Sequence, residues 1–188
     1  MRYAVAAVLA ACALLVFASC GNDAARTPAA DPGGPGFNGT DVMFLQMAVP
    51  HHGQGVRLVR LAARRAVRPE VRTLAAAIEA TQLTEIKAMA DRLRGWGRPP
   101  RAPAHAHAAH GGMPETTEAE LEALGRSSGP AFERVFLNTL IAHQDDAVQL
   151  ARMELAAGAD PRTRELARRI DRSRTAQIDH MLTLLGTR

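Results

Sequence analysis

Apolar residues recur at three- and four-residue steps along most of the chain beyond residue 40. This spacing places them on one face of a helix, so it predicts amphipathic helices. Breaks rich in Gly and Pro separate the periodic segments and indicate the turns between them. The first predicted helix begins at Asp41, and the second runs from Pro69 to Gly95. Two further long helices are predicted from about 131 to 157 and from about 161 to 185. A short helix between the two pairs is capped by Thr116 or Thr117 and extends through Leu124.

The first predicted helix has two notable features near its start. Thr40 or Asp41 is a suitable N-cap, because a short polar side chain can accept a hydrogen bond from the first turn. Pro50 lies inside the helix, where it lacks an amide hydrogen and crowds the carbonyl of Gln46. We therefore expect a kink or a local bulge just before the adjacent pair His51 and His52.

The two halves of the helical region resemble each other. Sliding the chain by about 92 residues aligns the segments without a gap, including Phe44 with Phe136, His51 with His143, Ile86 with Ile178 and Met89 with Met181. Two amphipathic hairpins, 41–95 and 131–186, can bury their apolar faces against each other. We therefore predict an all-α fold, a ferritin-like four-helix bundle built from two duplicated hairpins, with a crossover through the loop 98–114.

The segment before the bundle predicts export. Residues 1–19 have a basic start, an apolar middle and small residues at the end, which is typical of a secretory signal peptide. The sequence Phe17-Ala18-Ser19-Cys20 resembles the bacterial lipobox, so Cys20 is expected to carry a lipid anchor. Residues 20–40 are rich in Ala, Gly and Pro and predict a flexible tether. We expect an extracytoplasmic protein attached to the cell membrane through lipid.

Charge and cysteine content narrow the class of function. The net charge of +4 includes Arg2 of the leader, and the remaining charges are dispersed, which argues against a nucleic-acid partner. The second cysteine, Cys12, also lies in the leader, so no disulfide can form within the processed chain. Stability must then come from packing.

The first predicted helix carries candidate metal ligands. Met47 and His51 are four residues apart and share the apolar face, so both are expected to point inward. His52 is rotated by roughly 100° and is expected at a flank or a helix–helix seam, near the entrance of a site. The duplication brings His143 into the core at the position equivalent to His51. Thioether and imidazole together favour copper, above all Cu(I), over magnesium or calcium, although other transition metals remain open.

Other residues are candidates of lower rank. Glu85 and Met89 on the second helix offer a carboxylate and a thioether to the same site. The carboxylates are too few for the ligand set of a di-iron bundle. His105, His107 and His110 in the loop between the hairpins are expected to capture metal ions with little geometric control.

Two alternatives remain open at this point. The histidines of the bundle are also compatible with a structural or interaction protein in which they are buried and hydrogen-bonded without a metal. A metal-dependent oxidoreductase is the other alternative. The sequence shows no catalytic constellation of the familiar kinds, so we predict that the protein is not an enzyme.

The pattern of the first hairpin resembles the bacterial family named domain of unknown function (DUF) 305. The resemblance rests on Asp41, Phe44, Met47, Pro50, His51 and His52, followed by Ala75, Ile78, Gln82, Glu85, Ile86 and Met89. It implies an exported or lipid-anchored, ferritin-like bundle, with copper binding in some members. It also implies that Met47, His51 and His52 belong to the site, together with Glu85 and Met89.

The second hairpin departs from the pattern of that family. Members often repeat the methionine and the paired histidines there, whereas this chain has Thr139 and Gln144 at those positions. We therefore expect one asymmetric site, formed by His51, His52 and His143.

Overall fold

The computed structural model describes residues 34–103, 106 and 116–186, and these residues form helices joined by turns. Four helices are long and one is short. Their bounds are α1 Gly39–Arg65, α2 Pro69–Gly95, α3 Glu118–Arg126, α4 Gly129–Ala157 and α5 Pro161–Gly186. None of these described helices is both long enough and apolar enough to cross a membrane. The predicted leader, the tether up to residue 33 and the loop histidines lie outside the described residues.

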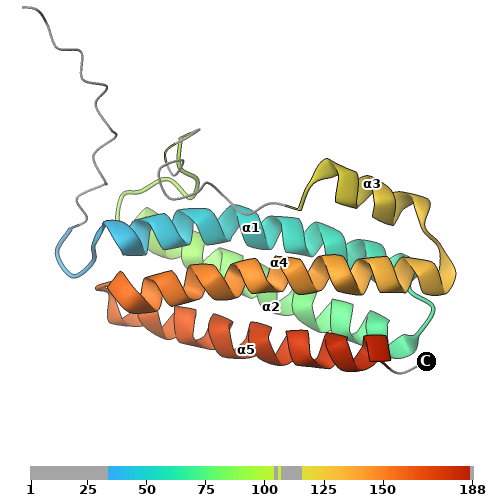
Figure 1. Cartoon of the computed structure of the whole chain (residues 1–188). Coiled ribbons are helices and arrows are strands. Elements are labelled where there is room, and N and C mark those ends of the chain that lie inside the picture. Colours follow the sequence, from blue (N-terminus) through green and yellow to red (C-terminus); the bar gives the residue numbers. More distant parts are fainter. Residues whose placement is uncertain (1–33, 104–105, 107–115, 187–188) are drawn as a thin grey trace, which may run out of the picture.

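The four long helices form a bundle (Figure 1). Helix α1 packs antiparallel to α2, α4 packs antiparallel to α5, and α1 also packs against α4. Helices α2 and α4 run in the same direction, so the chain between them has to return along the length of the bundle. Helix α3, which belongs to this connection, packs on α4. The predicted all-α, ferritin-like bundle of two hairpins is thus confirmed.

Helix α1 begins earlier than predicted and continues without interruption. Asn38, rather than Thr40 or Asp41, is the N-cap, and it forms a capping box with Asp41. Every residue from Gly39 to Arg65 is α-helical, so the bulge predicted at Pro50 does not occur. Packing on α2 and α4 supports the helix on both sides of the proline, which offsets the lost hydrogen bond.

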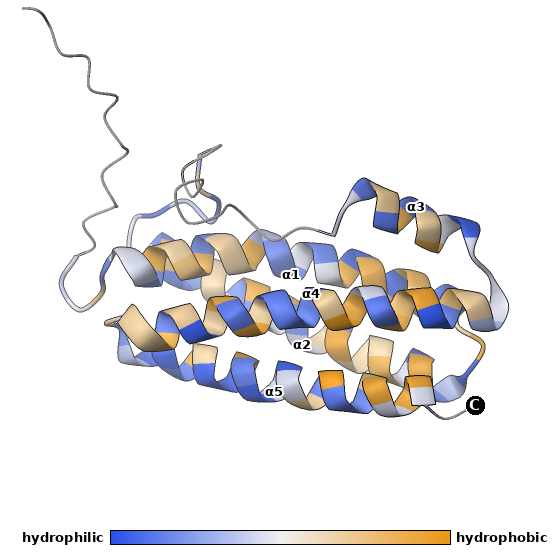
Figure 2. Cartoon of the chain, viewed as in Figure 1, coloured by the Kyte–Doolittle hydropathy of each residue, from blue (hydrophilic) through white to orange (hydrophobic). Residues whose placement is uncertain are grey.

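The interior of the bundle contains two apolar clusters. One includes Phe44, Met47, Met89 and Ile170, and the other includes Leu58, Phe132, Phe136 and Met181. Figure 2 shows hydrophilic and hydrophobic residues interspersed along each long helix, as expected for helices with one buried face. Buried polar side chains occupy the helix positions between the two clusters. They are His51, His52, Gln82, His143, Gln144 and Arg174.

The duplication seen in the sequence extends to individual contacts. Each hairpin has an ion pair between its two helices at equivalent positions. The residue just before the second helix of each hairpin donates its backbone N–H to a carboxylate of the opposite hairpin. The ion pairs are Arg60–Glu79 at 2.7 Å and Arg152–Asp171 at 3.2 Å. The backbone contacts are Arg68 N to Glu133 Oε1 at 2.5 Å and Asp160 N to Asp41 Oδ1 at 2.9 Å. The hairpins are therefore related by a pseudo-twofold axis.

A candidate metal centre at the pseudo-twofold axis

Two histidines at equivalent positions of the duplication stack on each other in the core. The ring centroids of His51 and His143 are 3.9 Å apart and the ring planes differ by 7°. Their exposed fractions are 0% and 2%. His51 Nε2 lies 3.0 Å from the backbone oxygen of His143. Because a carbonyl oxygen only accepts, Nε2 of His51 carries the hydrogen in this conformation.

His143 has a buried ring nitrogen without a partner among the described residues. This atom is Nε2, and both polar atoms of the Gln82 amide are likewise unpaired. Thr116 Oγ1 lies 3.4 Å from the other ring nitrogen, Nδ1. When Nδ1 donates its hydrogen to Thr116, Nε2 carries the lone pair, which is the form in which imidazole binds a metal.

The electrostatic environment keeps His143 uncharged. Desolvation by burial lowers the pKa of His143 to about 2, with further contributions from the nearby positive charge of Arg174 and from the other histidines. The ring is therefore a neutral imidazole throughout the physiological pH range. A buried neutral imidazole is suited to binding a metal ion and unsuited to pairing with an anion.

Gly55 leaves the space into which these unpaired groups point. A Cβ atom at this position would lie 2.4 Å from Gln82 Oε1 and 2.7 Å from His143 Nε2. Both distances are far below a normal van der Waals contact, so the two polar atoms converge over the bare glycine. One turn earlier in α1, His51 lines the same region.

We expect Gly55→Ala to destabilise the protein by about 1–3 kcal/mol, because the added methyl group displaces two buried polar side chains. Gly53 is a matched control in the same helix, since a Cβ there would meet no atom within 4 Å. Gly53→Ala should stabilise the helix by up to about 1 kcal/mol. Chemical denaturation of both variants checks this prediction, and equal effects at the two glycines would contradict it.

His52 belongs to a separate buried network. Its Nε2 lies 3.0 Å from Glu85 Oε2 of α2 and 3.3 Å from a terminal nitrogen of Arg174 of α5. The same nitrogen of Arg174 donates to Glu85. His52 lies at a helix–helix seam, one of the two positions expected from the sequence, but its predicted place at an entrance is wrong, because it is only 1% exposed. Helices α2 and α5 cover the flank of α1 on which it lies.

This network holds Glu85 as a carboxylate. Burial alone would raise the pKa of Glu85, but the hydrogen bond from His52 and the charge of Arg174 outweigh it and keep the pKa below its usual value. Desolvation lowers the pKa of His52 despite its contact with Glu85. The result is a buried ion pair between Glu85 and Arg174 with a histidine against it.

The second hairpin has a neutral version of the same contact. Gln144 and Gln177 occupy the positions equivalent to His52 and Glu85, and Gln144 Nε2 donates to Gln177 Oε1 at 2.5 Å. The substitution at Gln144 was identified from the sequence, but the role of Arg174 was not. The signal was available, since Arg174 follows the buried Ile170 by one turn on the apolar face of α5.

Other predicted ligands lie in the adjacent apolar cluster. Met47 and Met89 are 2% and 0% exposed and belong to the same cluster of buried side chains. Met47 precedes His51 by one turn of α1. The apolar cluster that adjoins the histidines therefore contains two thioethers.

The donor chemistry fits a soft metal ion, although the side chains are arranged in pairs in this conformation. Within the described ranges, no three His, Cys, Asp or Glu residues are grouped closely enough to hold a metal. Coordination through His51 Nε2 would break its hydrogen bond to the backbone of His143. The unpaired His143 Nε2 needs no such exchange, and Nδ1 of His52 is likewise unpaired among the described residues.

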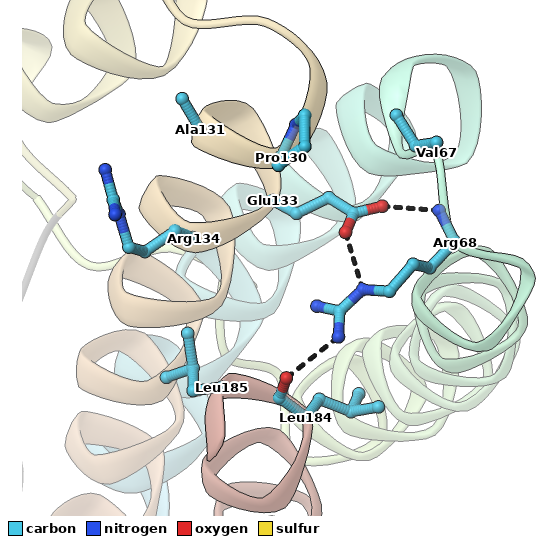
Figure 3. Close-up of a pocket in the computed structure, with 8 residues that line it drawn as sticks. All are labelled: Val67, Arg68, Pro130, Ala131, Glu133, Arg134, Leu184 and Leu185. Atoms are coloured by element: carbon cyan, nitrogen blue, oxygen red, sulfur yellow. Dashed lines mark hydrogen bonds and ion pairs between the residues drawn. The ribbon is translucent and has the colours of Figure 1, made fainter. Parts of the chain in front are cut away.

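A pocket of about 360 Å³ lies elsewhere, at the end of the bundle where α4 begins and α5 ends. Figure 3 shows Arg68 contacting both Glu133 and the backbone oxygen of Leu184, whereas no contact is drawn for Arg134. The remaining lining is largely apolar. None of the predicted ligands lines this pocket.

A comparison with protein families shows to which family the chain belongs. The model of the family described as domain of unknown function (DUF305) matches residues 41–185. The chain belongs to the DUF305 family. The resemblance inferred from the sequence is therefore confirmed. A comparison with curated proteins found no match.

Solved structures of DUF305 proteins have the same fold. A protein from Streptomyces coelicolor, described as secreted, has a TM-score of 0.74 and 28% identity, and the match covers 78% of this chain and 92% of that one. A DUF305 fragment from Deinococcus radiodurans has a TM-score of 0.69 and 32% identity, with 83% and 99% covered. CopM in its Cu(I)-bound form has a TM-score of 0.65 and 27% identity, with 78% and 95% covered.

Proposed function

We propose that this DUF305 protein binds copper outside the cytoplasm, where it sequesters the ion or hands it over, and that it does so without catalysing a reaction. CopM, which shares the fold, has been crystallised with Cu(I), Cu(II) and silver. The similar protein from Streptomyces coelicolor, described as secreted, supports an extracytoplasmic location. Lipid attachment through Cys20 remains part of the proposal.

The observation that carries this proposal is the buried, neutral His143 with its unpaired Nε2, stacked on His51. Leaving a buried polar atom unpaired costs free energy unless a ligand compensates for it. The thioethers of Met47 and Met89 in the neighbouring cluster give the site a soft character, which suits Cu(I). Gln82 and the space over Gly55 complete the region that would receive the ion.

Each predicted residue has a part in this proposal. His143 and His51 are the nitrogen donors, and Met47 and Met89 are the sulfur donors. His52 and Glu85 form the adjoining network, in which Glu85 fixes the orientation of the histidine ring. Separately, His105, His107 and His110 would capture ions before transfer to the bundle. Copper supplies no chemistry here beyond its own binding and release.

Thermal unfolding tests the proposal through the linkage between binding and stability. At a free Cu(I) concentration about 100 times the dissociation constant, binding adds about 2.7 kcal/mol, which raises Tm by roughly 5–10 °C in a domain of this size. The rise should disappear in His51→Ala and persist when His105, His107 and His110 are all replaced by alanine. A rise that vanished only with the loop histidines would move the site to the loop.

The hydrogen bonds of His51 and His52 favour one alternative, a structural or interaction bundle. In that case the bonds to the His143 carbonyl and to Glu85 hold the helices together, and no metal is involved. The same experiment separates the two functions, since this alternative predicts that copper leaves Tm unchanged.

A further inference from the structure

Arg174 is an unusual residue for the core of a bundle. Its side chain is completely buried, and it is the largest side chain in the fully buried set. Its terminal nitrogen donates to Glu85 and lies 3.3 Å from His52 Nε2, while its Nε has no partner among the described residues. A guanidinium is always charged in proteins. The fold therefore fixes a permanent positive charge beside the candidate ligands.

The duplication shows that this charge is specific to one half of the molecule. The position equivalent to Arg174 in the first hairpin is Gln82, whose amide lies near Gly55 and His143. The chain thus has a neutral residue on one side of the histidine pair and a cation on the other. The charge also reaches the pair itself, since Arg174 contributes to the lowered pKa of His143.

We infer that Arg174 is the specificity-determining residue of the site and makes it select monovalent soft cations over divalent ones. This inference rests on the proposed function. The guanidinium of Arg174 already binds the carboxylate of Glu85. This carboxylate is therefore not available to compensate the charge of a divalent ion. In addition, its buried charge cancels the attraction that the Glu85 carboxylate would otherwise exert on an incoming cation.

The effect of Arg174 depends on the charge of the ion. Coulomb energy is proportional to charge, so a buried guanidinium disfavours an ion of charge two by twice the free energy that it costs an ion of charge one. Affinity depends exponentially on free energy, so the factor for the divalent ion is the square of the factor for the monovalent ion. Comparing a variant with the wild type for each ion separately removes the intrinsic preference of the ligands.

The test is a competition titration of the full-length protein with Ag(I) and with Cu(II). Arg174→Gln, which installs the residue of the equivalent position in the first hairpin, should raise the affinity for Ag(I) about tenfold and that for Cu(II) about a hundredfold. Arg174→Met keeps the bulk without the charge and should give the same pair of factors. Arg174→Lys keeps the charge and should leave the ratio between the two ions unchanged.

Arg152→Gln is the matched control. Arg152 pairs with Asp171 at the surface, and its side chain is 57% exposed, so its removal should change either affinity less than about twofold. Equal factors for Ag(I) and Cu(II), or no increase, in a folded Arg174→Gln or Arg174→Met protein would overturn this inference alone. Failure of the wild type to bind either ion would overturn the proposed function and this inference with it.

Discussion

Replacing Glu85 by alanine is expected to destabilise the metal-free protein by about 3–5 kcal/mol. The variant leaves Arg174, which is 0% exposed, as a charged group in the core without its counter-charge. Removing one partner of a buried pair costs far more than the pair contributes, because the remaining charge cannot return to water. Urea denaturation of the metal-free protein measures this loss.

The same helix provides the control for this prediction. Glu79 pairs with Arg60 at the surface, where the side chains are 26% and 50% exposed. Glu79→Ala should therefore cost less than about 1 kcal/mol. The double variant Glu85→Ala with Arg174→Met should recover most of the loss, because a buried ion pair can often be replaced by apolar side chains. A loss in the double variant as large as in Glu85→Ala would show that the charge is not the cause.

A second buried carboxyl, Glu154, is expected to make stability depend on pH. Glu154 is 0% exposed and lies on the buried face of α4, in its last turn. Its side chain folds over Gly158, where a Cβ atom would lie 2.0 Å from Glu154 Oε1. Neither carboxyl oxygen of Glu154 has a hydrogen-bond partner among the described residues. The nearby Asp41 accepts from the backbone N–H groups of Ala159 and Asp160, and protonation of Glu154 removes the charge repulsion from it.

The direction of the effect follows from the pKa. Burial, followed by the proximity and charge of Asp41, raises the pKa of Glu154 to about 9, whereas the unfolded value is 4.5. Between these two values the folded protein holds a proton that the unfolded chain releases. Glu154 therefore lowers stability by about 1.4 kcal/mol for each pH unit as pH rises through this range, or about 3 kcal/mol by pH 7.

Glu154→Gln replaces the carboxyl group by an amide that stays neutral at every pH. The variant should match the wild type near pH 4.5 and be more stable by about 3 kcal/mol at pH 7. Urea midpoints at the two pH values measure the difference. Glu122→Gln, at an exposed position on α3, should shift both midpoints equally. A Glu154→Gln protein that gained no stability relative to the wild type as pH rose would refute the raised pKa of Glu154.

The sequence predicts the bundle well because periodicity and duplication are properties of the chain itself. The alignment of His51 with His143 follows from the repeat alone, and the structure brings these two rings together at the pseudo-twofold axis. The helix start was placed two residues late because Thr40 and Asp41 are also good caps. The capping box of Asn38 with Asp41 decides between such neighbours only when the backbone is known.

The charged groups of the core could not be predicted with the same certainty. Arg174 and Glu154 both occupy helix positions that face inward, but what they contact depends on the opposite hairpin. The sequence left His52 between a flank and a helix–helix seam for the same reason, since this side of α1 is buried only because α2 and α5 bring Glu85 and Arg174 over it. Hydrophobic periodicity describes one helix at a time, whereas the contacts of His52, Glu85 and Arg174 join the three helices α1, α2 and α5.

The most direct test of copper binding at the buried histidines is the Cu(I) affinity of the full-length protein, measured by competition with a chromophoric chelator. We predict binding by the wild type and a loss of about a hundredfold or more in His143→Ala, since even residues behind a metal ligand commonly contribute about 10- to 100-fold. Replacement of His105, His107 and His110 by alanine should change this affinity less than about threefold. Unchanged Cu(I) affinity in a folded His143→Ala protein would contradict the proposed site.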